Sequence, residues 1–216
     1  MARILVLAGV NGAGKSSLLG TWLRDAGLTW YNPDAFTRRL VEQGWALGEA
    51  NAAAWSEGTR RLRQAMADHT DFAFETTLGG NTIPRLLREA CDSHEVAIWF
   101  CGLHSVPLHV QRVADRVSQG GHDIPQDKIR ARYDSARENL IELLPHLAEL
   151  HVYDNSAAAD ATGRATLLPL LQLDRDGVHH PVTVIDLLKT PDWAKPIVMR
   201  AMELHANAWS ISSEMP

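Results

Sequence analysis

Ile4-Leu5-Val6-Leu7-Ala8, followed without a break by Gly9-Val10-Asn11-Gly12-Ala13-Gly14-Lys15-Ser16, is the stretch that decides the fold. The second part matches the phosphate-binding pattern GxxxxGK[ST]. The apolar run before it and Ser17-Leu18-Leu19-Gly20-Thr21-Trp22-Leu23 after it predict a strand that enters the loop and a helix that leaves it. The alternative is a glycine-rich turn that binds nothing. Such a turn would need neither a strand before it nor a helix after it. We expect a nucleotide phosphate at the helix N-terminus, where backbone N–H groups and the helix dipole favour an anion. The expected nucleotide contacts are Gly9, Asn11, Gly12, Ala13, Gly14, Lys15, Ser16 and Ser17.

Within this loop, two side chains have predicted chemical roles. Lys15 is expected on the β- and γ-phosphates, and the Ser16 hydroxyl is expected to bind Mg²⁺. The pattern does not by itself distinguish a kinase from a GTPase, a motor or an ATP-dependent switch. The guanine-reading Asn-Lys-x-Asp motif of translational GTPases is absent from the sequence.

Composition places the chain among ordinary globular proteins. Of its 216 residues 45% are hydrophobic and 22% charged, and the net charge of −5 argues against a general electrostatic surface for nucleic acid. We find neither an apolar run of membrane-spanning length nor a signal peptide, so we expect no membrane association and a cytoplasmic location. Cys91 and Cys101 lack metal-ligand spacing and are interpreted as small apolar groups rather than a disulfide.

Strand-like and helical segments alternate along the chain, which predicts an α/β fold of three layers, the P-loop NTPase (nucleoside-kinase-like) architecture, with a five-stranded parallel sheet as its core. We expect one kinase domain over residues 1–216, with the core at about 1–156 and a C-terminal β-hairpin and helix at about 164–208. The hairpin is expected from Leu167–Leu173 and Val182–Ile185, and the closing helix from Pro191–Ala206. The expected parallel strands are 4–8, 28–31, 72–74, 96–103 and 150–153.

Acidic residues follow two of these strands. Asp34 lies near the end of the 28–31 segment, where it is able to accept the proton of an acceptor hydroxyl or, alternatively, to cap the following helix. Glu75 ends the 72–74 strand and is a candidate for holding Mg²⁺ or for binding substrate hydroxyls, with Thr76 and Thr77 as neutral hydrogen-bonding neighbours. A capping or surface carboxylate is the simpler explanation of Glu75.

Arginines gather around a Gly-Gly segment. Arg112 and Arg116 are one helical turn apart, so they project to one face beside Gly120-Gly121, which is able to act as a lid that closes over phosphates. A solvated helix face is the alternative. His122 and Arg132 are further candidates of the same kind.

Six motifs together are more specific than the phosphate loop: GVNGAGKSS, YNPD, FAFETTL, QRVADRVSQGGHDIP, KIRARY and VYDNS. In this order and spacing they resemble the zeta-toxin-like P-loop kinases, in the branch with a Gly-Gly-His lid, over residues 3–156. The tail at Pro191-Asp192-Trp193-Ala194 also resembles this branch.

The resemblance implies an ATP-dependent or GTP-dependent kinase whose best-known relatives phosphorylate UDP-N-acetylglucosamine and related nucleotide sugars. It implies that Asp34 is the catalytic base and that Glu75 and Thr77 line the sugar-nucleotide pocket. It also implies that Arg112 stabilises the transferred phosphoryl group. Arg116, His122 and Arg132 are the candidates for a second phosphate-stabilising arginine or its replacement.

A separate antitoxin protein is a further implied partner, and no antitoxin domain is expected at the N-terminus. Two alternatives remain open: a P-loop kinase of another metabolite or antibiotic hydroxyl, and a non-catalytic ATP-binding regulatory module.

Overall fold

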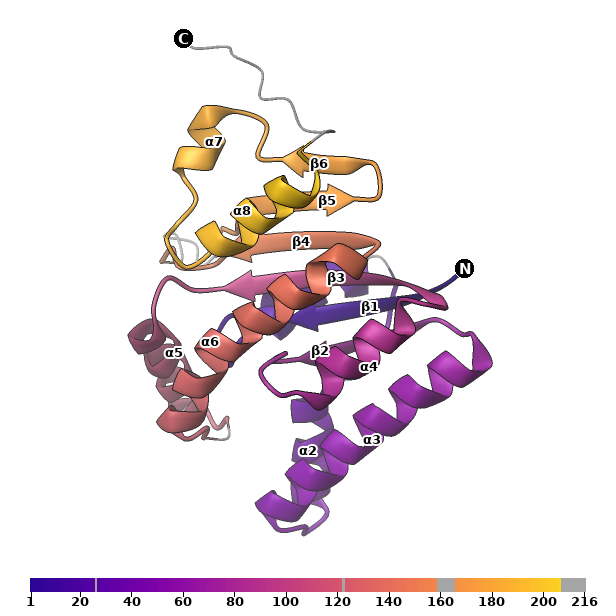
Figure 1. Cartoon of the computed structure of the whole chain (residues 1–216). Coiled ribbons are helices and arrows are strands. Elements are labelled where there is room, and N and C mark those ends of the chain that lie inside the picture. Colours follow the sequence, from indigo (N-terminus) through magenta and orange to yellow (C-terminus); the bar gives the residue numbers. More distant parts are fainter. Residues whose placement is uncertain (26, 122, 159–165, 207–216) are drawn as a thin grey trace.

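A mixed β-sheet forms the centre of the computed structural model, which describes residues 1–25, 27–121, 123–158 and 166–206 (Figure 1). In this part of the chain the strand order is β2-β1-β3-β4-β5-β6. The first four of these strands in space are parallel, and β5 and β6 continue the sheet antiparallel. The strands are β1 (Ala2–Ala8), β2 (Phe72–Thr76), β3 (His94–Gly102), β4 (Glu149–Asp154), β5 (Leu168–Asp174) and β6 (Gly177–His180).

Helices cover both faces of the sheet, as the three-layer prediction requires. On the face toward the viewer in Figure 1, α4, α6 and α8 pack over the strands. The helical segment that follows β1 lies on the opposite face, behind the sheet. The helical elements are η1 (Lys15–Leu19, a π-helical turn), α1 (Gly20–Asp25), α2 (Pro33–Glu42), α3 (Leu47–Asp68), α4 (Thr82–Ala90), α5 (Val106–Ser118), α6 (Gln126–Leu143), η2 (Leu144–His146, a 3-10 turn), α7 (Val184–Leu188) and α8 (Lys195–Leu204).

The prediction of five parallel strands is wrong at the 28–31 segment. Only Tyr31 pairs with β2, through an isolated parallel bridge to Phe74. The segment is short because Gly27 turns the chain after α1 and Asn32 begins the cap of α2. In this interval the Trp30 ring packs so closely on α1 that a Cβ at Gly20 would lie 2.6 Å from it.

The predicted hairpin is present, but its second strand begins earlier than expected. β6 follows the turn at Asp176-Gly177 directly. The expected strand Val182–Ile185 is not a strand: Thr183 caps α7, and Val184 and Ile185 are its first two residues. The reason is a capping box, in which the side chains of Thr183 and Asp186 each bind the other residue's backbone N–H and so start a helix. The hairpin also extends the main sheet instead of forming a separate unit.

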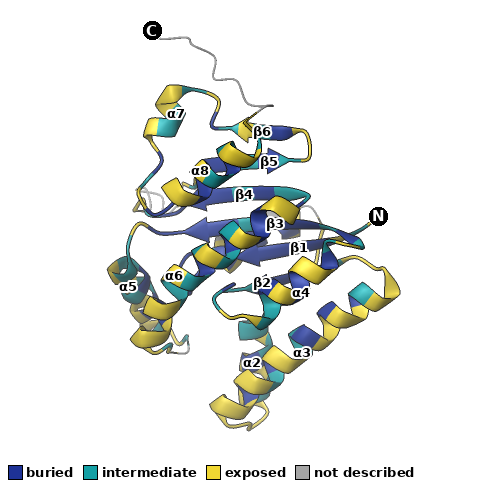
Figure 2. Ribbon diagram, in the orientation of Figure 1, coloured by how far each residue is buried: buried dark blue, intermediate teal, exposed yellow. Residues whose placement is uncertain are grey.

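Alternating strand residues divide the core into two parts. Ile4, Val6 and Phe100 face α4, α6 and α8, whereas Leu5 and Leu7 face η1 and α1. Figure 2 shows the strands as the most buried elements. Because both faces are covered, the central residues of β1 and β3 are apolar, and polar groups such as Glu75 and Asp154 lie at the carboxyl ends of the parallel strands.

Trp193 attaches the C-terminal region to the sheet. Its indole Nε1 donates a 2.7 Å hydrogen bond to the buried Asp154 carboxylate at the end of β4. The ring lies against Gly102 at the end of β3, where an added Cβ would approach the ring to 2.3 Å. No helix in the described part of the chain combines the length and apolar character needed to cross a bilayer.

Candidate active site

Close packing shapes the phosphate loop between β1 and η1. Gly9, Gly12 and Gly14 have φ values of 138°, 84° and 94°, which favour glycine. A Cβ at Gly9 would also lie 2.1 Å from the backbone oxygen of Cys101, and one at Gly12 would lie 2.8 Å from that of His109. The loop therefore rests directly on β3 and α5, with no room for side chains at these two positions.

Two buried groups hold the loop from below. The Ala13 carbonyl accepts a hydrogen bond from the Cys101 thiol at 3.0 Å and another from Asn155 Nδ2 at 2.9 Å. Burial raises the pKa of the Cys101 thiol to about 12, so the group stays protonated and able to donate. Cys91 is half-buried, and both cysteines are free.

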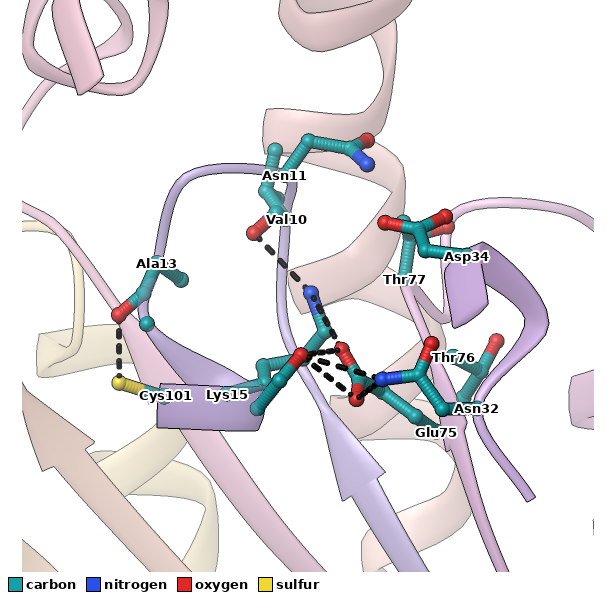
Figure 3. Close-up of polar contacts among 12 residues, drawn as sticks. Val10, Asn11, Ala13, Lys15, Asn32, Asp34, Glu75, Thr76, Thr77 and Cys101 are labelled. Atoms are coloured by element: carbon teal, nitrogen blue, oxygen red, sulfur yellow. Dashed lines mark hydrogen bonds and ion pairs between the residues drawn. The ribbon is translucent and has the colours of Figure 1, made fainter. Parts of the chain in front are cut away.

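The loop leads into a polar cluster formed by Lys15, Ser16, Asn32 and Glu75 (Figure 3). The Ser16 hydroxyl lies 2.9 Å from both carboxylate oxygens of Glu75, and Asn32 Nδ2 donates to Glu75 Oε2 at 2.8 Å. Lys15 Nζ lies 3.8 Å from Glu75 Oε1, and the two side chains are each 8% exposed. Glu75 reaches this point because β2 pairs with β1 in a register that sets it beside Leu7.

This cluster has the composition of a magnesium site. Mg²⁺ prefers oxygen ligands, and P-loop NTPases hold it with the loop Ser or Thr and an acid at the end of a neighbouring strand. Ser16 and Glu75 fit that pair by residue type and by proximity. Glu75 is buried at the loop, so the alternative of a surface carboxylate is wrong.

Asp34 lies in the first turn of α2, but it does not cap the helix. The cap is Asn32, whose Oδ1 accepts a 2.9 Å hydrogen bond from the N–H of Ala35. The Asp34 side chain is 42% exposed, and one carboxylate oxygen lies 3.6 Å from Arg116 on α5. Its carboxylate is therefore partly exposed at the border of the cavity over the phosphate loop.

Two cavities meet at these residues. The loop cavity, about 850 Å³, lies over the phosphate loop and is bordered by α5 and α2. The helix cavity, about 680 Å³, lies between the end of β2, α2, α3 and α6. The residues that line both are Asn11, Lys15, Asn32, Asp34 and Glu75.

The other predicted site residues divide between the two cavities. The loop cavity is lined by the predicted loop residues and by two arginines of α5: Gly12, Gly14, Ser16, Ser17, Arg112 and Arg116. Thr76, Thr77 and Arg132 line the helix cavity. Gly9 and Ala13 line neither and support the loop from beneath. His122 lies outside the described residues.

The arginines make different contacts. Arg112 donates to the backbone oxygen of Ala157 at 3.2 Å. Arg132 donates to Asn11 Oδ1 at 2.7 Å and therefore touches the phosphate loop itself. Burial lowers the pKa of Arg132, and the nearby Asp34 carboxylate opposes that shift.

Sequence reasoning missed three residues that shape this site: Asn32, His109 and Asn155. Asn32 was recognisable as an Asn before Pro33, a usual helix-start signal. His109 Nδ1 lies 2.8 Å from the Asn11 carbonyl oxygen, and because that oxygen only accepts, Nδ1 carries the proton. Burial lowers the pKa of His109 to about 4. Asn155 lies in the VYDNS motif, just after the expected 150–153 strand, but was given no role there. No local pattern marks His109, because its contact depends on how β1 and α5 pack.

Comparison with known proteins gives likenesses of fold. No family model matches the chain. An uncharacterized protein of Haemophilus influenzae is 28% identical over 132 residues, which are 61% of this chain and 92% of that protein. A chain in the crystal structure of AvrRxo1-ORF1:-ORF2 with ATP superposes with a TM-score of 0.62 at 14% identity, over 99% of this chain and 66% of that one.

A chain of the PezAT chromosomal toxin–antitoxin system of Streptococcus pneumoniae superposes with a TM-score of 0.53 at 14% identity, over 97% of this chain and 80% of that one. This chain shares its α/β fold with these two structures over nearly its whole length. This chain spans just under two thirds of the length of the AvrRxo1 structure chain. At these identities the likeness concerns the fold alone.

Proposed function

We propose that this protein is an ATP-dependent kinase, with GTP as an alternative donor, that transfers the γ-phosphate to a hydroxyl group of a small molecule. The observation that carries the proposal is the meeting of the two cavities at Lys15, Asp34 and Glu75. A nucleotide on the phosphate loop would present its γ-phosphate at this boundary. An acceptor in the helix cavity would approach it from the other side.

Phosphoryl transfer depends mainly on positioning and on stabilising charge. Lys15 would bind the β- and γ-phosphates, and Ser16 and Glu75 would hold Mg²⁺. When bound, Mg²⁺ supplies neutralising charge to the phosphate oxygens. Asp34 would accept the proton of the acceptor hydroxyl while the new O–P bond forms and the bond to ADP breaks. Arg112 lines the loop cavity and would stabilise the transferred phosphoryl group.

Arg132 is our choice for the second phosphate-stabilising arginine among the candidates. It is the candidate whose guanidinium binds a side chain of the phosphate loop, and it also lines the helix cavity. Arg116 is instead directed to Asp34, where it would orient the base.

For the acceptor, we propose a nucleotide sugar such as UDP-N-acetylglucosamine. The resemblance of the Glu75-Thr76-Thr77 segment to the zeta-toxin-like kinases supports this class. The size of the helix cavity and its mixed lining support it too, because aromatic side chains (Tyr31, Trp55, Phe74) alternate with hydrogen-bonding ones (Thr37, Asn51). Another metabolite or an antibiotic would use the same transfer machinery with a different fit in this cavity.

The protein is also proposed to be the toxin of a toxin–antitoxin pair, with the antitoxin as a separate chain. The support is the similarity of fold to a chain of the PezAT system. Growth arrest on expression of the wild type, and normal growth with Lys15→Ala, is the expected result.

The test of the proposal is incubation with ATP, Mg²⁺ and a panel of nucleotide sugars, free sugars and aminoglycosides, with mass spectrometry to detect the gain of one phosphate. We expect a phosphorylated nucleotide sugar with the wild type and none with Lys15→Ala. Phosphate on another compound alone would replace the proposed acceptor class. ATP binding without any phosphorylated product, in the panel or in a metabolite extract, would instead indicate a regulatory module.

A further inference from the structure

Asn11 is held from two sides by helices that follow it far along the chain. The residue is 6% exposed. Its carbonyl oxygen lies 2.8 Å from His109 Nδ1 on α5, and its side-chain Oδ1 accepts from Arg132 on α6 at 2.7 Å. One residue of the phosphate loop thus joins both of the helices that lie on either side of the Gly120-Gly121 segment.

The contact with Arg132 fixes the orientation of the Asn11 amide. A guanidinium group only donates hydrogen bonds, so the amide atom that faces it is the oxygen. The Nδ2 group is therefore turned away from Arg132.

Arg132 has little freedom to leave this position. Its stem packs on Gly79, where an added Cβ would lie 2.7 Å from Arg132 Cγ and 3.2 Å from its Cα. The stem is thus fixed by the loop after β2, and the end of the side chain is fixed by Asn11. Arg130, two residues earlier on α6, is exposed and lines neither cavity.

We propose that Asn11 is a positioning residue whose side-chain amide holds the Arg132 guanidinium at the boundary of the two cavities, directed toward the γ-phosphate of the bound nucleotide. The inference rests on the proposed function, because it assumes that a nucleoside triphosphate occupies the phosphate loop. The role assigned to Asn11 goes beyond wrapping the phosphates. Its side chain positions Arg132, and the Arg132 guanidinium is the group that binds the γ-phosphate.

The test compares the affinities for ADP and for a non-hydrolysable ATP analogue, both with Mg²⁺ and without acceptor, by calorimetry. Their ratio reports the γ-phosphate contact. Arg132→Met, which keeps the stem on Gly79, is expected to reduce the preference for the analogue about tenfold, as for the loss of a hydrogen bond to a charged group. Asn11→Ala is expected to reduce the preference for the analogue by a similar factor.

The double variant decides between positioning and a general loosening of the loop. If Asn11 acts through Arg132, Asn11→Ala costs nothing further in the Arg132→Met background. The proposal is overturned if the two substitutions reduce the preference for the analogue additively. It is also overturned if Asn11→Ala weakens ADP and analogue binding equally, because the ratio is then unchanged. Arg130→Ala is the control that removes a charge from the same helix and is expected to leave the ratio unchanged.

Two further outcomes are distinguishable. Should Asn11→Ala not fold, Asn11→Ser replaces it in the same cycle, because its side chain is too short to reach Arg132. If no acceptor is ever phosphorylated but the ratio depends on Arg132 and Asn11 as stated, the proposed kinase function fails and the positioning role stands. If an acceptor is phosphorylated and the cycle is additive, the kinase function stands and the positioning role fails.

Discussion

Replacing Asp34 by Asn separates a catalytic role from a structural one. The structural contribution of the carboxylate is small, because its ion pair with Arg116 is 3.6 Å long and both side chains are more than one third exposed. Exposed pairs contribute about 0.2–1 kcal/mol to the free energy of unfolding. A carboxylate in the first turn of a helix adds about 0.3–1 kcal/mol. Since Asn32 caps α2, Asp34→Asn leaves the cap intact.

The catalytic contribution is expected to be larger. A positioned general base accelerates proton transfer by about 10²- to 10⁴-fold. At 1.36 kcal/mol for each factor of ten, this is about 2.7–5.4 kcal/mol of transition-state stabilisation. We therefore expect kcat to fall at least a hundredfold in Asp34→Asn, while the free energy of unfolding falls by less than about 2 kcal/mol.

The assay is the initial rate of phosphorylated product by mass spectrometry, with urea unfolding to measure stability. The matched control is Asp127→Asn, which removes a carboxylate from the first turn of α6 outside both cavities. Its kcat is expected to stay at the wild-type value. If Asp34→Asn retains more than about one tenth of kcat with a stable fold, Asp34 is not the base and the reasoning is refuted.

Two further predictions concern stability. Because burial lowers the pKa of His109 from 6.5 to about 4, the unfolded chain binds a proton between these values that the folded chain does not. Stability from this group is therefore fully present above pH 6.5 and falls by about 2 kcal/mol on going to pH 5. His109→Gln is expected to show a correspondingly weaker pH dependence in urea unfolding, and an unchanged dependence would contradict the buried, neutral imidazole. Gly9→Ala is expected to destabilise by about 3 kcal/mol or more, because positive φ costs about 1–2 kcal/mol and overpacking adds about 1–3. Gly44→Ala, with φ of 92° and open space around it, is its control and should show the φ cost alone in thermal unfolding.

Much of the fold followed from the sequence because its signals are local. The phosphate loop and the apolar strands each depend on a few neighbouring residues, and the structure confirms helices on both faces of the sheet. The error at Val182–Ile185 overlooked a local signal, the capping box of Thr183 and Asp186. The error at the 28–31 segment arose where distant packing decided the outcome. Tyr31 pairs at a single position because the chain must also place Trp30 on α1, and neither contact is visible in the residues around it.

The same distinction applies to the candidate site. Lys15 and Ser16 belong to one continuous motif, so their proximity was predictable. That Glu75 would bind Ser16 depends on the register between β1 and β2, which the sequence indicated only as two apolar runs. The contact between Asn11 and Arg132 spans 121 positions and has no local signal.

The single bridge at Tyr31 affects how the acceptor preference of such a protein can be altered. Since the sheet ends there, α2 and α3 form the outer wall of the helix cavity without contributing a strand, and they pack mainly on one another. The phosphate loop instead rests on β3, β4 and α5. Because α3 lines the helix cavity and not the loop cavity, exchanging α3 between related proteins should transfer preference for the proposed acceptor and leave the loop cavity intact. If the proposed kinase function holds, libraries built on that segment are the starting point for redirecting the protein to new hydroxyl compounds.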